Sequence, residues 1–347
     1  MTTTSLQEPD EQPLSVFERW SRILGGGWIF LLLIALCVIF GALRPDQFGS
    51  SFNLSMLAVN AAILLVLSVG QTFVIIAAGI DLSVGTVLVF ASITSAQVML
   101  LLSGASSGTY GATSGGWGVV AIGLIVALAS GAFWGVVNGV LVAVGRIPAL
   151  IVTLGTFGMA LGFAQLLTNG TDIRAVPEVL VDQVGSGTIA GIPVLVVIAI
   201  AVAAVGAVVL HLTRFGIHVF AVGSDKEAAR RAGINVGRRL ITIYTLSGTL
   251  AGLAAMMSTA RFATTTIGGH AMDNLSTISA VVLGGTSLFG GIGSIAGTLV
   301  GVFIPIVLLN GFVILGIPPF WQTVATGAVL IFAVWIDQLK RRSRERS

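Results

Sequence analysis

Long stretches without a charged side chain constrain the fold of this sequence more than any other feature. No Asp, Glu, Lys or Arg occurs at positions 23–43, and none at positions 82–145. About 20 apolar residues are enough for a helix to cross the hydrocarbon core of a membrane. The charge-free windows therefore predict an all-α polytopic membrane protein.

The lengths of these windows predict about ten transmembrane helices. The windows occupy positions 23–43, 47–80, 82–145, 147–171, 183–213, 240–260 and 274–336. A Ser/Gly-rich stretch at 103–116 divides the third window into two spans. Glycine-rich breaks at 284–293 and 316–319 divide the last window into three. Each remaining window predicts one helix.

Composition excludes several other classes of protein. Only 9% of the 347 residues are charged and 55% are hydrophobic, whereas a soluble domain is about 25% charged. An ordinary soluble enzyme and a disordered chain are therefore excluded. The single cysteine, Cys37, excludes a disulfide framework, and the three histidines lack the spacing of metal ligands. We predict no metal site, no cofactor and no nucleic-acid partner.

The distribution of Lys and Arg predicts the orientation in the membrane. With ten crossings and the N-terminus inside, 14 of the 17 basic residues lie inside, and only Arg44, Arg174 and Arg261 lie outside. Both termini are therefore expected in the cytoplasm. Residues 1–22 are expected to be a disordered cytoplasmic N-terminus, residues 23–337 the transmembrane domain, and residues 338–347 a basic cytoplasmic tail.

The longest charged segment, residues 214–239, is predicted to lie in the cytoplasm and to contain a short amphipathic helix. Ser224 or Asp225 can cap the start of this helix and Gly233 can end it. We expect two to three turns. A solvated loop that follows the positive-inside rule would explain the arginines equally well, but a partner's groove suits a face of small residues. That face consists of Ala228, Ala229 and Ala232.

Glycines recur at the spacing that lets helix backbones approach closely. They form the ladders Gly131, Gly135, Gly139 and Gly293, Gly297, Gly301, and the pairs Gly158, Gly162 and Gly248, Gly252. Small residues four positions apart are typical of tightly packed membrane helices. The ladders predict close helix packing and say little about a ligand.

Polar residues inside the predicted spans are candidates for a solute pathway. Asp81 is the one acid between long apolar runs, and an intramembrane carboxylate is a functional candidate. Because Gly79 can end one helix and Asp81 or Ser83 can cap the next, a capping role is favoured over direct handling of a proton or solute. Each amide taken singly is more often an interhelical hydrogen bond. The candidates are Asn60, Gln71, Asp81, Asn138 and Asn310.

No catalytic residue is predicted. Neither of the two lysines, Lys226 and Lys340, follows a Gly or precedes a Ser or Thr, so the chain has no Walker A loop. No Ser/His pair or pair of acids along the sequence suggests an intramembrane hydrolase.

Four segments resemble motifs of the ribose-type (carbohydrate) ABC importer permease family. They are AGIDLSVG at 78–85, RIPALIVTLGT at 146–156, GSDKEAARRAGIN at 223–235 and AVVLGGTSLFGG at 280–291. The resemblance runs from about residue 53 to about residue 340 in the family's order and spacing.

The resemblance implies a permease for a monosaccharide, such as a ribose-like pentose, another sugar or a polyol, in a bacterial cell (inner) membrane. It implies a second permease copy, a cytoplasmic ABC ATPase and an extracytoplasmic solute-binding protein as partners, with membrane lipid around the chain. The cytoplasmic helix would then be the coupling helix that docks in the ATPase. The implied coupling residues are Gly223, Ser224, Asp225, Glu227, Ala228, Ala229, Arg230 and Gly233.

Two alternatives stay open. The stretch GHAMDNL at 269–275 departs from the family's pattern on the outer side, which argues against a simple ribose assignment. A permease for branched-chain amino acids or nucleosides, whose overall architecture is related, is the first alternative. An ion-coupled secondary transporter would need several intramembrane acids or bases to bind the coupling ion, and only Asp81 qualifies.

Overall fold

The computed structural model describes residues 28–105, 111–270 and 273–345. The predicted disorder of residues 1–22 lies outside this part of the chain. Seven of the described helices are long and apolar enough to cross a membrane. They are α4 (Ser51–Ile76), α5 (Val84–Leu102), α6 (Trp117–Ala143), α7 (Ala149–Thr168), α9 (Val194–Leu212), α12 (Val236–Phe262) and α14 (Ile295–Ile314).

Three further helices occupy the other predicted spans. They are α2 (Trp28–Leu43), α13 (Asp273–Leu283) and α15 (Pro319–Glu345). With 11 residues, α13 is about 16 Å long, roughly half the thickness of the hydrocarbon core. The break at 284–293 was expected to separate two full spans, and it instead follows a half-length helix. The last helix, α15, continues through most of the predicted tail.

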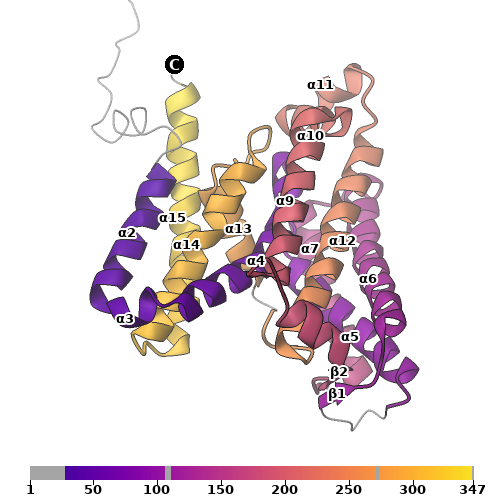
Figure 1. Ribbon diagram of the computed structural model, residues 1–347. Helices are drawn as coiled ribbons and strands as arrows, with labels where there is room; N and C mark the ends of the chain where they lie inside the picture. The colour runs from indigo at the N-terminus through magenta and orange to yellow at the C-terminus, as the bar shows by residue number, and fades with distance from the viewer. Residues whose placement is uncertain (1–27, 106–110, 271–272, 346–347) are drawn as a thin grey trace, which may run out of the picture.

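Short elements connect the long helices at the two ends of the bundle. They are α3 (Pro45–Phe48), α8 (Glu178–Leu180), η1 (Val181–Gly185), α10 (Arg214–Ser224) and α11 (Lys226–Arg231). Strands β1 (Gly111–Thr113) and β2 (Ala175–Pro177) pair in parallel, and β3 (Thr188–Ile189) pairs antiparallel with β4 (Ile192–Pro193). Figure 1 shows α10, α11 and the C-terminus at one end and β1, β2 and α3 at the other. We call these the α11 end and the β1 end.

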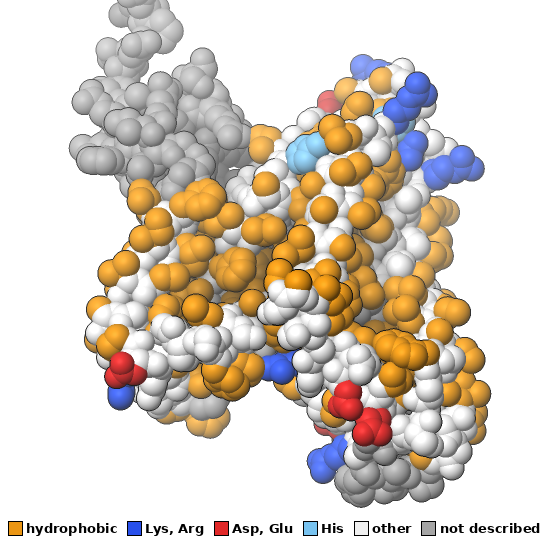
Figure 2. Space-filling view, in the orientation of Figure 1, with side chains coloured by type: hydrophobic (Ala, Val, Ile, Leu, Met, Phe, Trp, Pro, Cys, Tyr) orange, Lys and Arg blue, Asp and Glu red, His pale blue; other side chains and the backbone are white. Residues whose placement is uncertain are grey.

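Helix α4 forms the centre of the bundle. Its most hydropathic stretch is 94% buried, whereas the corresponding stretches of α7 and α9 are each 28% buried. The outer helices expose large apolar side chains such as Leu154, Phe163 and Val205. Figure 2 shows hydrophobic side chains covering the flanks and basic ones gathered at the α11 end. This surface suits lipid around the flanks, because water would not solvate so many apolar groups.

The glycine ladder of α6 packs against α12 with no side chain between the two backbones. A Cβ atom at Gly131 would overlap with the carbonyl oxygen of Gly248, and one at Gly135 would overlap with that of Tyr244. In the same way Gly301 of α14 lies against the Ala280 carbonyl of α13. The spacing argument is confirmed for these helices.

The pair Gly158 and Gly162 does not follow this pattern. A Cβ atom at either position would meet no heavy atom of the chain within 4 Å. Both glycines lie on a face of α7 that no other element covers. The expectation of close packing is therefore wrong for this pair within the described chain.

Two irregular segments interrupt the bundle next to one another. The first joins α4 to α5 and includes Ala78 at φ 56°. The second joins α13 to α14 and includes Gly285, Gly290 and Gly291 at φ 90°, 87° and 74°. Non-helical backbone at membrane depth is tolerated only where the protein covers it or a cavity solvates it. These two breaks are therefore the places to look for a functional site.

Candidate functional site

The predicted coupling segment, residues 214–239, contacts both breaks through backbone atoms. The N–H of Gly291 donates a 2.8 Å hydrogen bond to the carbonyl oxygen of Ile76 at the end of α4. A Cβ atom at Gly223, near the end of α10, would overlap with the same carbonyl oxygen. A Cβ atom at Gly290 would lie 2.6 Å from the Gly223 carbonyl oxygen and 2.7 Å from the Ala78 Cβ atom. We call Ile76, Ala78, Gly223, Gly290 and Gly291 the coupling junction.

Helix α11 is capped at both ends as its sequence predicts. The Asp225 carboxylate accepts hydrogen bonds from the N–H groups of Glu227 and Ala228, at 2.8 and 3.0 Å. At the other end Gly233 adopts φ 83°. Its N–H donates to Arg230 and the next N–H donates to Ala229, which is the Schellman arrangement. The prediction that Asp225 starts the helix and Gly233 ends it is confirmed.

The length of this helix and the choice of its buried alanine both differ from the prediction. Helix α11 has six residues, fewer than the expected two to three turns, because Asp225 starts it and α10 already occupies the preceding residues. Ala229 is only 4% exposed and belongs to the main hydrophobic core. Ala228 and Ala232 are exposed. Ala229 therefore holds α11 on its own protein, and the small face open to a partner consists of Ala228 and Ala232.

Hydrogen bonds to the backbone lower the pKa of Asp225. The N–H of Ala228 has the largest effect, that of Glu227 follows, and the positive charge of Arg231 adds to both. Each of these interactions favours the ionised carboxylate. The exposed ion pair of Arg230 with Glu227, at 2.9 Å, contributes little, because solvent screens it.

Asp81 lies in the break between α4 and α5, where it is 2% exposed. Its Oδ1 atom accepts from the Ser83 N–H at 2.9 Å and from the Ser83 hydroxyl at 2.6 Å. Its Oδ2 atom accepts from the Ser247 hydroxyl of α12 at 3.4 Å. Ser83 is the N-cap residue of α5, and no side chain in the described part of the chain makes a capping hydrogen bond to that helix. The predicted capping role of Asp81 is therefore wrong, and its carboxylate instead holds Ser83 in a local turn just before α5.

Side chains from three more helices hold the same break. The Asn138 amide of α6 donates to the Ser83 hydroxyl at 2.9 Å and accepts from the Thr156 hydroxyl of α7 at 2.7 Å. The Asn274 amide of α13 donates to the Leu82 carbonyl oxygen at 3.1 Å. The break is thus tied to α6, α7, α12 and α13. We call this network the Asp81 hub.

The structure brings together only two of the five predicted pathway residues, Asp81 and Asn138. Asn310 exchanges hydrogen bonds with Asn53, at 2.8 and 3.2 Å. Asn53 is 18 residues before Gln71 on α4, about 27 Å along the helix axis. Asn310 therefore joins α14 to the β1 end of α4. Asn60 lies on α4 between these two positions and is half-buried.

Gln71 is the one pathway candidate whose buried amide lacks a partner in the described part of the chain. Its side chain is 0% exposed, and neither its Nε2 nor its Oε1 atom makes a hydrogen bond. The Ser68 hydroxyl on the same face of α4 is also without a partner. An unpaired buried amide costs about 1–3 kcal/mol. These groups are therefore available to a solute or to water in another conformation.

The structure also contains a polar cluster that the sequence did not suggest. The Ser258 hydroxyl of α12 lies 2.6 Å from His270 Nε2, and His270 Nδ1 lies 2.7 Å from the Asp273 carboxylate at the start of α13. Ser258 lies in the last turns of α12 and is 2% exposed. The cluster therefore links α12 to α13. His270 and Asp273 are only three positions apart, whereas Ser258 is 12 positions before His270, so the fold is needed to bring Ser258 to the histidine.

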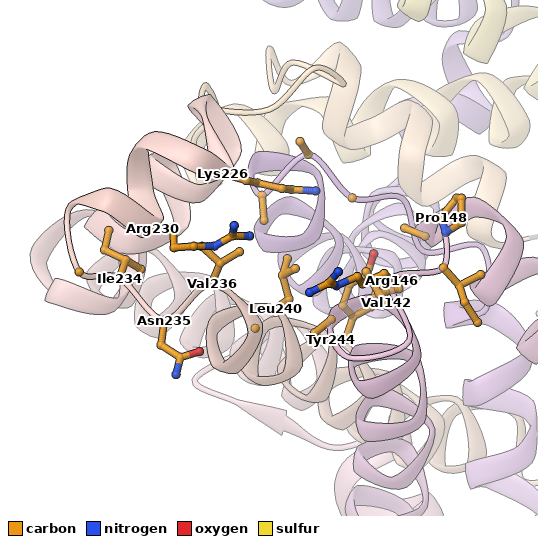
Figure 3. Close-up of a pocket in the computed structure, with 18 residues that line it drawn as sticks. Val142, Arg146, Pro148, Lys226, Arg230, Ile234, Asn235, Val236, Leu240 and Tyr244 are labelled. Carbon is orange, nitrogen blue, oxygen red and sulfur yellow. The ribbon is translucent and has the colours of Figure 1, made fainter.

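A pocket opens at the α11 end beside the coupling junction. It has a volume of about 730 Å³. Its wall is formed by the segment after α4, the connection between α6 and α7, helix α11 and the first turns of α12. Figure 3 shows Lys226 and Arg230 entering from one side and Arg146 and Tyr244 from the other. All three charged residues that line it are basic.

Within the described residues, no group of His, Cys, Asp or Glu side chains is arranged to hold a metal ion. The chemistry available at the junction, the hub and the pocket is hydrogen bonding, charge and backbone contact. Such an arrangement can bind and transmit movement.

Comparisons with known proteins identify the family of the chain. The profile of the family described as "Branched-chain amino acid transport system / permease component" matches residues 53–334. The chain is 35% identical over 319 residues to the fructose import permease protein FrcC of Rhizobium meliloti, covering 90% of this chain and 85% of the relative. It is 35% identical over 317 residues to the ribose import permease protein RbsC of Escherichia coli (strain K12), covering 90% and 93%.

A third relative carries a different sugar in its name. The chain is 30% identical over 327 residues to the galactose/methyl galactoside import permease protein MglC of Escherichia coli (strain K12), covering 91% of this chain and 94% of the relative. No solved structure matches the chain at a significant level. With most of its length matched by the family profile and by these relatives, the chain belongs to this family of membrane-embedded transport permease components.

Proposed function

We propose that this chain is the permease subunit of an ATP-driven ABC importer for a monosaccharide. The observation that carries the proposal is the set of relatives, which are import permeases for fructose, ribose and galactose at 30–35% identity over nearly the whole chain. The chain would form the translocation pathway in a bacterial inner membrane. ATP hydrolysis would take place in a separate cytoplasmic subunit.

The proposal includes a topology and a set of partners. The α11 end faces the cytoplasm, because the basic residues gather there. Helices α2, α13 and α15 complete about ten membrane segments, and the loop before α14 continues the crossing that the half-length α13 begins, because Gly291 of this loop reaches Ile76 near the α11 end. A second permease copy and an extracytoplasmic solute-binding protein complete the importer. The coupling face comprises Ser224, Asp225, Glu227, Ala228 and Arg230, while Gly223, Ala229 and Gly233 hold this face in place.

The coupling junction supports a mechanism in which the ATPase moves α11. Gly223 touches the Ile76 carbonyl group, and Gly291 is hydrogen-bonded to that group. Displacement of α11 would therefore reach the break after α4 and the break before α14 together. Since the Asp81 hub joins the first break to α6, α7, α12 and α13, several helices would shift as one body. The unpartnered amide of Gln71 would gain a partner when the pathway opens.

A permease for branched-chain amino acids is the second candidate. The description of the matching family favours it. The individual relatives named above favour a sugar. Nothing in the Asp81 hub provides the separate ammonium and carboxylate partners that an amino acid requires, because Asp81 is its one charged member.

Copurification from native membranes in mild detergent tests the function. Recovery of an ABC ATPase and a solute-binding protein that binds monosaccharides would support the proposal. A binding protein that takes leucine or isoleucine would replace it with the second candidate. Recovery of the chain alone, with uptake driven by a proton or sodium gradient, would contradict both.

A paired substitution tests the coupling face. Ala228→Glu with Arg230→Glu is expected to abolish association with the ATPase and to leave the folded permease intact, because both side chains are exposed. Arg174→Glu at the β1 end is the control for an added acid. The coupling assignment is wrong if the paired variant still binds the ATPase and supports uptake. Ala229 is unsuited to this test, because a buried charge would unfold α11.

A further inference from the structure

We propose that the pocket beside α11 is a binding site for a phosphate-bearing anion at the cytoplasmic mouth of the permease. The site itself is independent of the proposed function, and only its effect on import rests on that function. The argument uses the charge of the wall, the helix ends that open into it and one orphaned hydroxyl group.

The charge of the wall is positive and only partly compensated. Arg146, Lys226 and Arg230 line the pocket together with uncharged residues. Arg146 and Lys226 have no ion-pair partner among the described residues. Arg230 gives one guanidinium nitrogen to Glu227 and keeps its other donors. Cations that enter from opposite walls can contact one oxyanion group together, and a guanidinium matches phosphate oxygens in pairs.

Two long helices begin at the wall of the pocket. Helix α7 starts with Pro148 and Ala149, both of which line it. No side chain caps that helix, so the free N–H groups of its first turn have no side-chain acceptor. Helix α12 starts with Val236 and Gly237, which also line the pocket, although the Asn235 side chain already accepts one N–H of its first turn. The N-terminus of a helix favours a bound anion.

The Tyr244 hydroxyl group is the independent observation that points to a ligand. Tyr244 is 1% exposed and lines the pocket, yet its hydroxyl group has no hydrogen-bond partner among the described residues. An unpaired buried hydroxyl is costly, so it is expected to have a partner in some state of the protein. A phosphate oxygen or a hydroxyl group of the same ligand would satisfy it. The hydroxyl group lies beside Gly79, which also lines the pocket, and is free to donate a hydrogen bond to a ligand there.

The volume decides what size of ligand fits. About 730 Å³ is in the range of small-molecule sites and far exceeds a bare phosphate ion. A sugar phosphate or the head group of an anionic phospholipid fits equally well, and both carry the phosphate group that the wall recognises. By joining Arg146 on one wall to Lys226 and Arg230 on the other, the bound anion would fix α11 against the connection between α6 and α7.

Binding to the full chain in nanodiscs of neutral phosphatidylcholine tests the site. The binding of two soluble probes, inorganic phosphate and glucose 6-phosphate, is measured by isothermal titration calorimetry. Arg146→Gln is expected to weaken binding at least tenfold, and Arg231→Gln less than twofold, because Arg231 is next to Arg230 but does not line the pocket. Tyr244→Phe, which removes only the hydroxyl group, is expected to weaken binding about threefold or more.

Nanodiscs that contain phosphatidylglycerol distinguish the two sources of phosphate. If a lipid head group occupies the site, these discs will weaken the apparent binding of inorganic phosphate in the native chain but not in Arg146→Gln. If the ligand is soluble, these discs will not change the apparent binding of inorganic phosphate. The proposal is overturned if no probe binds saturably, or if Arg146→Gln and Arg231→Gln bind alike. Because none of these readouts uses transport, a failure of the proposed function would leave them unchanged.

Discussion

The N–H of Gly291 donates a 2.8 Å hydrogen bond to the carbonyl oxygen of Ile76. The carbonyl groups of the last turn of a helix have no partner within that helix. Here the loop before α14 provides the partner, at the point where Gly223 also touches the same carbonyl group. A backbone contact of this kind leaves no room for a side chain and no freedom for a rotamer change.

Gly223→Ala is expected to lower the unfolding temperature and to abolish uptake. The added methyl group would overlap with the Ile76 carbonyl oxygen, and overpacking of this kind costs about 1–3 kcal/mol or more. Gly155→Ala is the matched control, since a Cβ atom there would meet nothing within 4 Å. Thermal unfolding in detergent and uptake into proteoliposomes measure both effects. Equal behaviour of the two variants would contradict the close approach at Gly223.

Asp81→Asn is expected to keep most of the uptake activity, within about threefold. The amide oxygen can still accept from the Ser83 N–H and hydroxyl groups, which are the short contacts of Asp81. Asp81→Leu is expected to destabilise the fold by about 1–3 kcal/mol, because it leaves the Ser83 N–H unpaired. Uptake and unfolding temperature are measured for both. Loss of uptake in a stable Asp81→Asn variant would assign a proton or solute to this carboxylate instead.

Gln71→Leu is expected to raise the unfolding temperature while it lowers uptake at least tenfold. A leucine of similar size removes the cost of the unpaired buried amide. It also removes the group that we expect to bind the solute. Gln165→Leu, on the exposed face of α7, is the control for a lost amide. If Gln71→Leu is more stable and transports normally, Gln71 has no place in the pathway.

Lowering the pH is expected to weaken the hydrogen bonds that Asp225 accepts at the start of α11. Because the pKa of Asp225 is lowered by the N–H groups of Ala228 and Glu227, the ionised cap stabilises α11 at every pH above the ordinary carboxyl value of about 3.9. That stabilisation is lost as the pH falls through the lower pKa of the folded state. Amide hydrogen exchange of these two residues, corrected for its intrinsic pH dependence, measures the effect.

A comparison of two variants separates the cap from other acid effects. Asp225→Ala is expected to show low protection of the same amides at every pH. Asp225→Asn is expected to keep the protection and to lose the pH dependence, because an amide oxygen also caps helices. Unchanged protection in the alanine variant would show that the hydrogen bonds of Asp225 do not hold α11.

The local features of this chain could be predicted from its sequence because they depend on spacing and on short-range chemistry. The spacing of the glycines predicted close helix packing without naming the partner helix, and the charge-free windows predicted the long helices. Asp225 and Gly233 were recognised as helix ends because capping involves residues within three or four positions. Family motifs then gave the transport class, which the comparisons support.

The rest depends on contacts between distant segments. The sequence could not show that Ala229 is buried. The six-residue helix itself contains Lys226, Arg230 and Arg231, so all of its sides look exposed. It could not show that α13 is half-length, since no charge marks its end. The partners of Asn310 and His270 lie on other segments, so their roles required the fold. Gln71 is identified by a missing partner, which no sequence pattern records.

The contact between α6 and α12 limits how the protein can change shape. Neighbouring helices that slide past each other usually do so by small rotamer changes of the side chains between them, as in shear motion. Where Gly131 and Gly135 lie directly on the backbone of α12, there are no such side chains. We therefore expect these two helices to keep one relative position, and alternation between inward and outward access to come from rotation at the two breaks. Substitutions that stiffen those breaks should slow transport more than substitutions anywhere along the α6–α12 contact that leave the fold intact.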